Sequence, residues 1–155
     1  MASFMLKSDA FTDGTTLPAR FTCDGEDQSP PLSWSEPPEG TKSFALIVDD
    51  PDAPSGTFRH WAAFDIPAST RGLPAGAGNE TAGDIAQARN DFGRPGYGGA
   101  CPPPGHGTHH YRFKLFALDT DRLGLPPNAS IEQVEEAAAK RQLGRAELTG
   151  TYERK

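Results

Sequence analysis

One stretch, Gly96 to Asp119, changes from loop-forming to strand-forming composition at its centre, and it constrains the fold more than any other part of the chain. Its first half, from Gly96 to Gly107, is rich in glycine and proline, which favour turns of fixed shape. Its second half, from His109 to Asp119, alternates apolar and polar residues, which is typical of a strand with one buried face. Three of the four histidines lie at the junction. We therefore expect a shaped loop that places histidines at the start of a core strand.

The rest of the chain also combines short apolar runs with turn residues. With 17 glycines and 15 prolines among 155 residues, it favours many short strands joined by shaped loops. The length fits a single domain over residues 1–155, large enough to bury about 70% of the unfolded surface. We therefore predict one mainly β domain.

The strongest strand pattern runs from Lys42 to Asp50. Its two faces are both apolar, with Phe44, Leu46 and Val48 on one and Ala45 and Ile47 on the other. A strand that is apolar on both faces lies centrally in a sheet and is covered on both sides. The next apolar run begins at Phe58, and a hairpin would bring its His60 and Trp61 near the Asp50 end.

Two adjacent histidines are separated by the alternation of the strand from His109 to Asp119. Successive side chains of a strand point to opposite faces. His109 therefore points inward with Tyr111, and we expect His110, Arg112 and Lys114 to face solvent.

Weaker signals mark the remaining elements. Short extended pieces are expected around Phe4–Leu6, Leu17–Cys23, Leu32–Trp34 and Ile85–Phe92, with a long loop over Ala68–Asp84 and a closing strand over Arg145–Tyr152. Ser130 and Gln133 form a capping-box pattern, which predicts a helix that runs to about Leu143 and stops at Gly144.

Charge and the chain start argue against several classes of partner. The net charge is −6 without a clustered basic patch, so nucleic acid is not an expected partner. No apolar run approaches the roughly 20 residues of a membrane-spanning helix. The first residues lack the pattern of a signal peptide, so we expect a cytoplasmic protein. Cys23 and Cys101 then remain thiols by default, although the spacing leaves a disulfide open.

Several motifs together resemble the phosphatidylethanolamine-binding protein family, especially its bacterial and archaeal branch, called Raf kinase inhibitor-like or YbhB/YbcL-type. These motifs are Asp-Pro-Asp-Ala-Pro at 50–54, the strand around Trp61, Gly-Gly-Ala-Cys-Pro-Pro at 98–103, and Gly-Thr-His-His-Tyr at 107–111. The resemblance covers nearly the whole chain. It implies an antiparallel β-sandwich with one or two peripheral helices and a shallow anion pocket at one end.

The resemblance also implies which residues form the pocket. Carried over by position, and with His60 added because the hairpin would bring it close to the aspartates at 49–52, the set is Asp50, Ala53, Pro54, His60, Trp61, Gly99, Cys101, Pro103, His109 and Tyr111. This chain departs from the family pattern at two places. Ala63 stands where eukaryotic members have a histidine, and Cys101 replaces a glycine. His60 would lie on the strand face opposite Trp61 unless a bulge intervenes.

The expected function is non-catalytic binding of a small anionic group, such as phosphate, a carboxylate or a phospholipid head group. Donors would come from loop amides, the Tyr111 hydroxyl and the His109 imidazole, with Asp50 favouring the charged imidazole. Inhibition of a protein kinase or protease through the pocket rim is the alternative. A metal-dependent hydrolase using Asp50, Asp52, His60 and His109 is weighed third. We expect no cofactor or metal, and an exposed sheet face would permit a homodimer.

Overall fold

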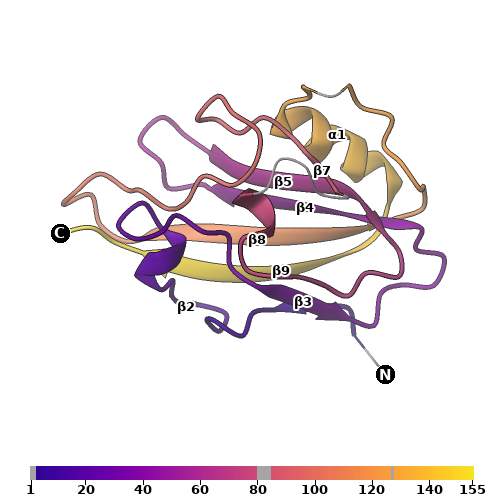
Figure 1. The fold of residues 1–155 in the computed structure, drawn as a ribbon, viewed down its shortest axis with the longest axis horizontal. Helices are drawn as coiled ribbons and strands as arrows, with labels where there is room; N and C mark the ends of the chain where they lie inside the picture. Colours follow the sequence, from indigo (N-terminus) through magenta and orange to yellow (C-terminus); the bar gives the residue numbers. More distant parts are fainter. Residues whose placement is uncertain (1–2, 80–84, 127) are drawn as a thin grey trace.

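Two β-sheets and a helix make up the computed structural model, which describes residues 3–79, 85–126 and 128–155 (Figure 1). The longer elements of these residues are β4 (Ser43–Asp50), β5 (Phe58–Pro67), β8 (His109–Leu118), β9 (Gln142–Tyr152) and α1 (Ile131–Arg141). The short elements are β1 (Met5–Lys7), β2 (Thr15–Thr16), β3 (Leu32–Ser35), β6 (Gly72–Leu73), β7 (Ala86–Gln87) and the 3₁₀ turns η1 (Ala19–Phe21) and η2 (Ala77–Asn79).

The strands form a small sheet ordered β1-β3-β6 and a large sheet ordered β2-β9-β8-β4-β5-β7. Among the described residues, these strands pair antiparallel apart from the short parallel β2–β9 contact. The small sheet covers one face of the large sheet and α1 packs on the other (Figure 1). The predicted antiparallel sandwich with a peripheral helix is therefore confirmed.

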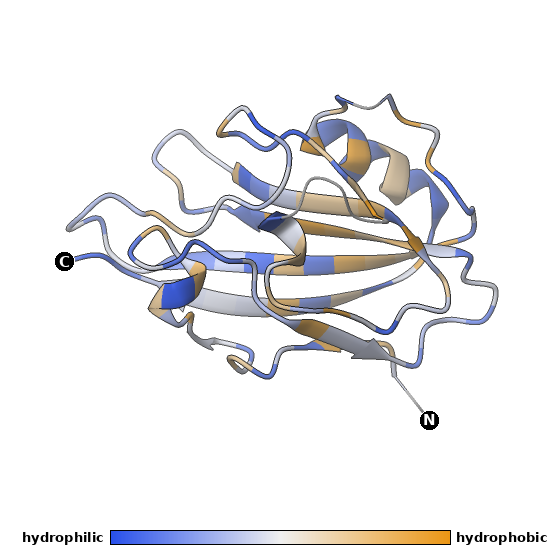
Figure 2. Ribbon diagram, in the orientation of Figure 1, coloured by the Kyte–Doolittle hydropathy of each residue, from blue (hydrophilic) through white to orange (hydrophobic). Residues whose placement is uncertain are grey.

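The central strand β4 is buried on both faces, as its sequence predicts. Phe44, Leu46 and Val48 belong to the core between the two sheets, whereas Ala45 and Ile47 belong to a second core under α1. In Figure 2 the central strands are hydrophobic over much of their length and β8 alternates between hydrophobic and hydrophilic residues. The fold thus buries both faces of β4 and the apolar face of the neighbouring β8.

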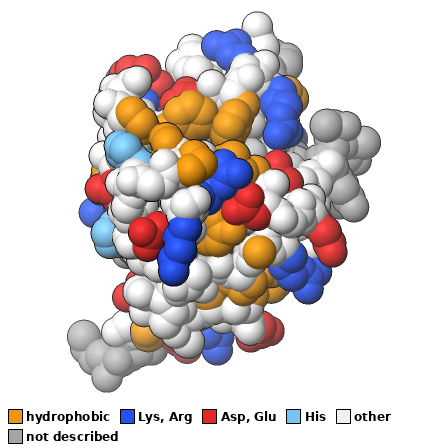
Figure 3. Space-filling view, turned by 90° about the vertical axis from the view of Figure 1, so that its left-hand side faces the viewer, with side chains coloured by type: hydrophobic (Ala, Val, Ile, Leu, Met, Phe, Trp, Pro, Cys, Tyr) orange, Lys and Arg blue, Asp and Glu red, His pale blue; other side chains and the backbone are white. Residues whose placement is uncertain are grey.

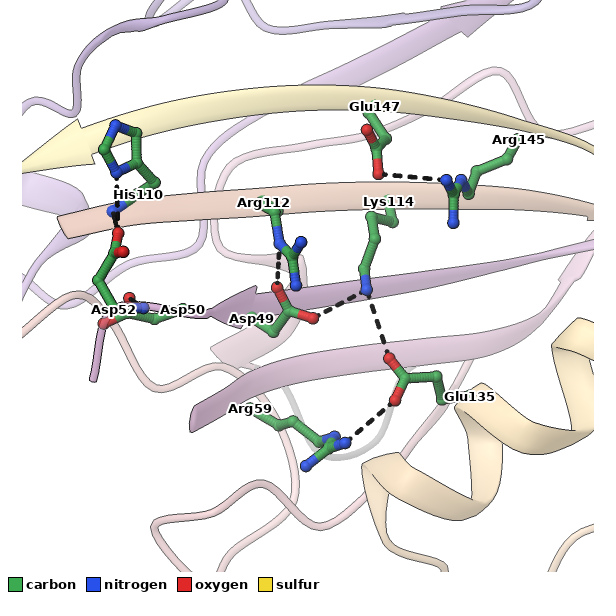
Figure 4. Close-up of polar contacts among 10 residues, drawn as sticks. All are labelled: Asp49, Asp50, Asp52, Arg59, His110, Arg112, Lys114, Glu135, Arg145 and Glu147. Atoms are coloured by element: carbon green, nitrogen blue, oxygen red, sulfur yellow. Dashed lines mark hydrogen bonds and ion pairs between the residues drawn. The ribbon is translucent and has the colours of Figure 1, made fainter. Parts of the chain in front are cut away.

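The outer face of β8 is only partly exposed, which corrects one expectation. His110 is exposed and Arg112 is half-buried, but Lys114 is buried. The Lys114 ammonium lies 2.8 Å from an Asp49 carboxylate oxygen and 3.3 Å from Glu135 of α1 (Figure 4). Alternation alone cannot show that a helix covers this face.

Two other local expectations are wrong. Leu17–Cys23 is not extended throughout, because residues Ala19–Phe21 form η1. The capping box of Ser130 and Gln133 is present, but α1 ends at Arg141 and β9 begins at the next residue. Gly144 pairs with Ala117 inside that strand instead of stopping the helix.

Within the expected loop Ala68–Asp84, β6 and η2 form, and residues 80–84 lie outside the described part.

The two cysteines are joined, against the default expectation of free thiols. Cys23 and Cys101 form a disulfide with a Cα–Cα distance of 5.4 Å. The bond links the turn after η1 to the glycine-proline loop before β8. Spacing could not predict this pairing, because 78 residues separate the two cysteines and only the folded chain brings them together.

Candidate ligand-binding site

A cavity of about 200 Å³ opens at the end of the large sheet where β4 ends and β8 begins. Figure 3 views the molecule from this end, where hydrophobic side chains gather beside histidines. The cavity is lined by Asp50, Ala53, Pro54, Phe58, His60, Phe92, Cys101, Pro102, Pro103, His109 and Tyr111. None of these residues is a lysine or arginine, so any anion held here must be bound by other donors.

Strand geometry brings the polar residues of the cavity together. Asp50 is the last residue of β4, and β8 runs antiparallel beside it from His109. Asp50 and His109 are 59 residues apart in sequence, yet their side chains meet. Tyr111 lies two residues along β8, so it faces the same side as His109. The meeting of the two motifs follows directly from the pairing of β4 with β8.

The Asp50–His109 pair forms the buried base of the site. His109 Nδ1 lies 2.6 Å from Asp50 Oδ2, and the two side chains are only 2% and 4% exposed. The other carboxylate oxygen of Asp50 accepts a hydrogen bond of 2.8 Å from the backbone N–H of Asp52. Asp50 thus accepts one of these two hydrogen bonds on each oxygen, and the carboxylate holds His109 in position.

His106 continues this chain of contacts outward. Its Nδ1 lies 2.7 Å from His109 Nε2, and the two rings are 4.9 Å apart between centroids. His106 is exposed on the loop between Cys101 and β8. Sequence reasoning missed this residue, although its position three residues before His109 in a glycine-flanked loop was a usable signal.

His60 owes its inward position to a β-bulge. Val48 pairs with Trp61 and Asp49 pairs with Arg59, which leaves His60 as an extra residue of β5. A bulge re-aims a side chain that regular alternation would send to the other face. His60 and Trp61 are consequently both buried.

The surroundings of His60 favour its neutral form. Burial lowers the pKa of His60 and outweighs the nearby carboxylates of Asp50 and Asp91, which act in the opposite direction. Its Nδ1 lies 2.7 Å from the carbonyl oxygen of Gly98, so Nδ1 carries the proton and donates it. The neutral ring then has an unprotonated Nε2, which is a hydrogen-bond acceptor.

The buried Tyr111 hydroxyl makes no well-formed hydrogen bond with the described residues, although the Asp50 carboxylate lies near it. Tyr111 is 2% exposed and its ring packs edge-on to His60 at 5.2 Å between centroids. Burial and then the neighbouring Asp50 carboxylate raise the pKa of Tyr111, so the hydroxyl keeps its proton. An unpaired buried donor is costly, and it is rare unless a ligand or water satisfies it.

An aromatic wall adjoins these polar groups and was not predicted. The rings of Phe58 and Phe92 are 4.8 Å apart between centroids, and each also packs on His60. Phe92 is 46% exposed, in the turn after Asn90. An aromatic residue in an Asn-Asp-Phe-Gly turn was the available signal, but its contact with β5 depends on tertiary packing.

Two residues of the predicted set do not line the cavity. Trp61 lies in the core between the sheets, where its indole N–H donates to Gln87. Gly99 donates its amide to Asp27, and Gly98 donates its amide to the His60 carbonyl. The expected loop amides therefore point toward the protein at these two positions. The other eight predicted residues are all among the lining residues.

The four residues weighed as metal ligands are engaged with protein partners, and Asp50 and His109 are paired with each other. Asp52 accepts from His110 on the surface, which lowers the pKa of Asp52, and His60 donates to a backbone carbonyl. No group of three or more histidine, cysteine, aspartate or glutamate side chains in the described ranges is placed to hold a metal ion.

Within the described ranges no helix has the length and apolar character needed to span a membrane.

Comparison with known proteins gives concordant matches. A family model described as phosphatidylethanolamine-binding protein matches residues 7–153. A UPF0098 protein of Aquifex aeolicus is 52% identical over 95% of this chain and 86% of the relative. A Mycobacterium tuberculosis relative with the words lipoprotein LppC in its name is 43% identical over 96% of this chain and 71% of its own. The crystal structure of Escherichia coli YbcL, described as a member of the mammalian PEBP family, has a TM-score of 0.93, 40% identity, and covers 99% of this chain and 100% of that chain.

Proposed function

The chain belongs to the phosphatidylethanolamine-binding protein family, and from this premise we propose that it binds the anionic head of a small ligand, a phosphate or carboxylate group, in the cavity beside Asp50, His109 and Tyr111. The binding is non-catalytic in this proposal. A phospholipid head group and a free phosphate share the chemistry that such a site would recognise.

The observation that carries the proposal is the unpaired Tyr111 hydroxyl in a lined cavity. A buried hydroxyl that keeps its proton can donate to an anionic oxygen, and hydrogen bonds to charged groups are stronger than those between neutral groups. The Asp50–His109 pair supports the proposal as well. If His109 carries both ring protons, the pair has no net charge and His109 Nε2 is a second donor.

The acceptor on His60 favours a ligand that can also donate. The neutral His60 ring has one acceptor nitrogen for a ligand, and the hydrogen of a protonated phosphate oxygen could bond to it. Phe58, Phe92 and the loop prolines form an apolar surface around these groups. A ligand with a small polar head and an apolar body would match this distribution.

Replacing Tyr111 by phenylalanine tests the proposal. The Tyr111→Phe variant should bind inorganic phosphate about tenfold more weakly or worse, because a donor to a charged oxygen is lost. Its unfolding free energy should not fall, since the hydroxyl has no partner in the free protein. Isothermal titration calorimetry and guanidinium unfolding measure the two effects.

Tyr97→Phe is the matched control for this test. Tyr97 is equally buried, but its hydroxyl donates to the Phe21 carbonyl at 2.6 Å, away from the cavity lining. That variant should keep phosphate binding and lose about 1 kcal/mol of unfolding free energy. Equal phosphate binding by wild type and Tyr111→Phe would contradict the proposed function.

Inhibition of a protein kinase or protease through the pocket rim remains the second candidate. The exposed Phe92 ring at the rim is the observation that favours it, because aromatic residues are enriched at protein interfaces. A pull-down in which wild type, but not Phe92→Ala, retains a kinase or protease would support this candidate.

The cellular compartment depends on the state of Cys23 and Cys101. The disulfide favours an oxidising compartment, because cytosolic reductants keep most thiols reduced. Two free thiols would instead favour the cytoplasm. Rapid alkylation of thiols in intact cells distinguishes the two compartments. A persistent disulfide supports an oxidising compartment, and two alkylated cysteines support the cytoplasm.

A further inference from the structure

A second imidazole occupies the atom of His109 that an anionic ligand would need. His106 Nδ1 lies 2.7 Å from His109 Nε2, while His109 Nδ1 is engaged with Asp50. A hydrogen bond between two imidazoles holds one proton on the line between the nitrogens. His109 Nε2 therefore cannot donate to a ligand while this contact exists.

His106 reaches His109 from outside the cavity. His109 is 1% exposed and lines the cavity, whereas His106 is exposed and is not among the lining residues. The bond to His109 is the single side-chain hydrogen bond of His106 within the described ranges. Its loss would leave the His106 imidazole in water and would free the buried His109 Nε2 for another partner.

The loop around His106 permits this movement. Gly105 and Gly107 flank the residue with φ angles of +77° and +94°, and a Cβ on either would meet no atom within 4 Å. Glycine reaches both positive and negative φ at low cost, so these two positions can change without strain. The loop is held by the Cys23–Cys101 disulfide, by β8 from His109 onward, and by a backbone hydrogen bond from the Gly105 N–H to the Arg154 carbonyl, so the movement is confined to the His106 side chain. A change at His106 therefore need not disturb the core.

We propose that an anionic ligand binds by displacing His106 from His109 Nε2, so that His106 acts as a built-in competitor at the site. This inference rests on the proposed function. In the free protein, His106 Nδ1 and His109 Nε2 share one hydrogen. In the complex, an oxygen of the ligand accepts that hydrogen and a second oxygen accepts the Tyr111 hydroxyl. His106 then sets the affinity without touching the ligand.

The test is a titration of inorganic phosphate into three proteins at one pH, with a chelator present to remove metal ions. His106→Ala should bind phosphate about fivefold more tightly than wild type, because the competing hydrogen bond is gone. His110→Ala should match wild type, since the His110 side chain is 54% exposed and contacts Asp52 rather than His109. In wild type, phosphate should also move the His106 ring ¹⁵N resonances toward those of a free imidazole.

Each other outcome contradicts the inference in a recognisable way. Equal phosphate affinity of wild type and His106→Ala would show that His106 does not compete with the ligand, and it would leave the proposed function unaffected. Weaker binding by His106→Ala shows that His106 itself donates to the ligand. Absence of phosphate binding by all three proteins removes the proposed function, and the inference with it. A far-ultraviolet circular dichroism spectrum that matches wild type shows that each variant is folded.

Discussion

At the scale of single residues, the cavity contains a hydrogen-bond donor, the Tyr111 hydroxyl, and a hydrogen-bond acceptor, His60 Nε2. The alternation of side chains along a strand could not assign either role. Tyr111 keeps its proton and has no partner, whereas His60 is neutral and uses Nδ1 to bond Gly98. The positions of both atoms depend on neighbours from other strands. The identities of these residues were readable from the sequence, but their hydrogen-bonding states follow from burial.

The lowered pKa of His60 predicts an acid-sensitive fold. A buried neutral histidine takes up a proton more readily when unfolded, so its contribution to stability is present above the unfolded pKa of about 6.5 and is lost as pH falls below it. The slope for one proton is at most about 1.4 kcal/mol per pH unit. We expect the unfolding free energy of wild type to fall between about pH 7 and 5.

His60→Asn isolates this contribution, because an asparagine amide can still donate to the Gly98 carbonyl. The difference in unfolding free energy between wild type and His60→Asn should shrink as pH falls, as measured by urea unfolding at several pH values. A difference that is independent of pH, or grows as pH falls, would show that His60 is not held neutral.

At the scale of elements, a partly buried network of charges joins β4 and β8 and connects them to α1 and β5. Asp49 of β4 is 1% exposed and contacts Arg112 and Lys114 of β8, each at 2.8 Å (Figure 4). Lys114 then contacts Glu135 of α1, and Glu135 contacts Arg59 of β5 at 3.2 Å. The network lies on the α1 side of the sheet, opposite the cavity, and ties together the two strands that carry Asp50 and His109.

Removing the buried carboxylate should destabilise this arrangement. Asp49→Ala leaves two cations without their common partner, and breaking a buried ion pair costs about 3 kcal/mol or more. Glu147→Ala is the control, because Glu147 makes an exposed pair with Arg145 at 3.8 Å and should change the unfolding free energy by about 0.5 kcal/mol or less. Guanidinium unfolding compares the two variants, and similar losses would mean that the network is not stabilising.

At the scale of the whole molecule, the disulfide links the two ends of a long loop and borders the site. Cys23 and Cys101 are 78 residues apart, and Cys101 lines the cavity. A cross-link that closes so long a loop restricts the unfolded chain strongly. The disulfide thereby links the glycine-proline loop before β8, which lines the cavity, to the turn after η1.

The Cys23→Ser, Cys101→Ser double variant should therefore unfold more easily. We expect a loss of about 4 kcal/mol in unfolding free energy relative to the oxidised protein, measured by guanidinium unfolding without reductant. Wild type in excess reductant should approach the double variant. A double variant as stable as the oxidised wild type would show that the cross-link does not limit the unfolded state.

The sequence by itself determined the long strands, the start of the helix and the face of most strand residues. Apolar runs predicted β4, β5, β8 and β9, and the capping box predicted the start of α1, because such patterns depend on neighbours within a few residues. The family motifs also predicted seven of the residues that line the cavity, and His60, added from its place on the neighbouring strand, is an eighth.

Only the tertiary structure decided what joins those elements and what each polar atom does. The bulge that turns His60 inward, the Lys114 burial under α1, the Cys23–Cys101 bond and the His106–His109 contact all depend on packing between segments. Local patterns carry little information about such contacts, because the free energy that fixes them comes from burial and pairing in the folded chain.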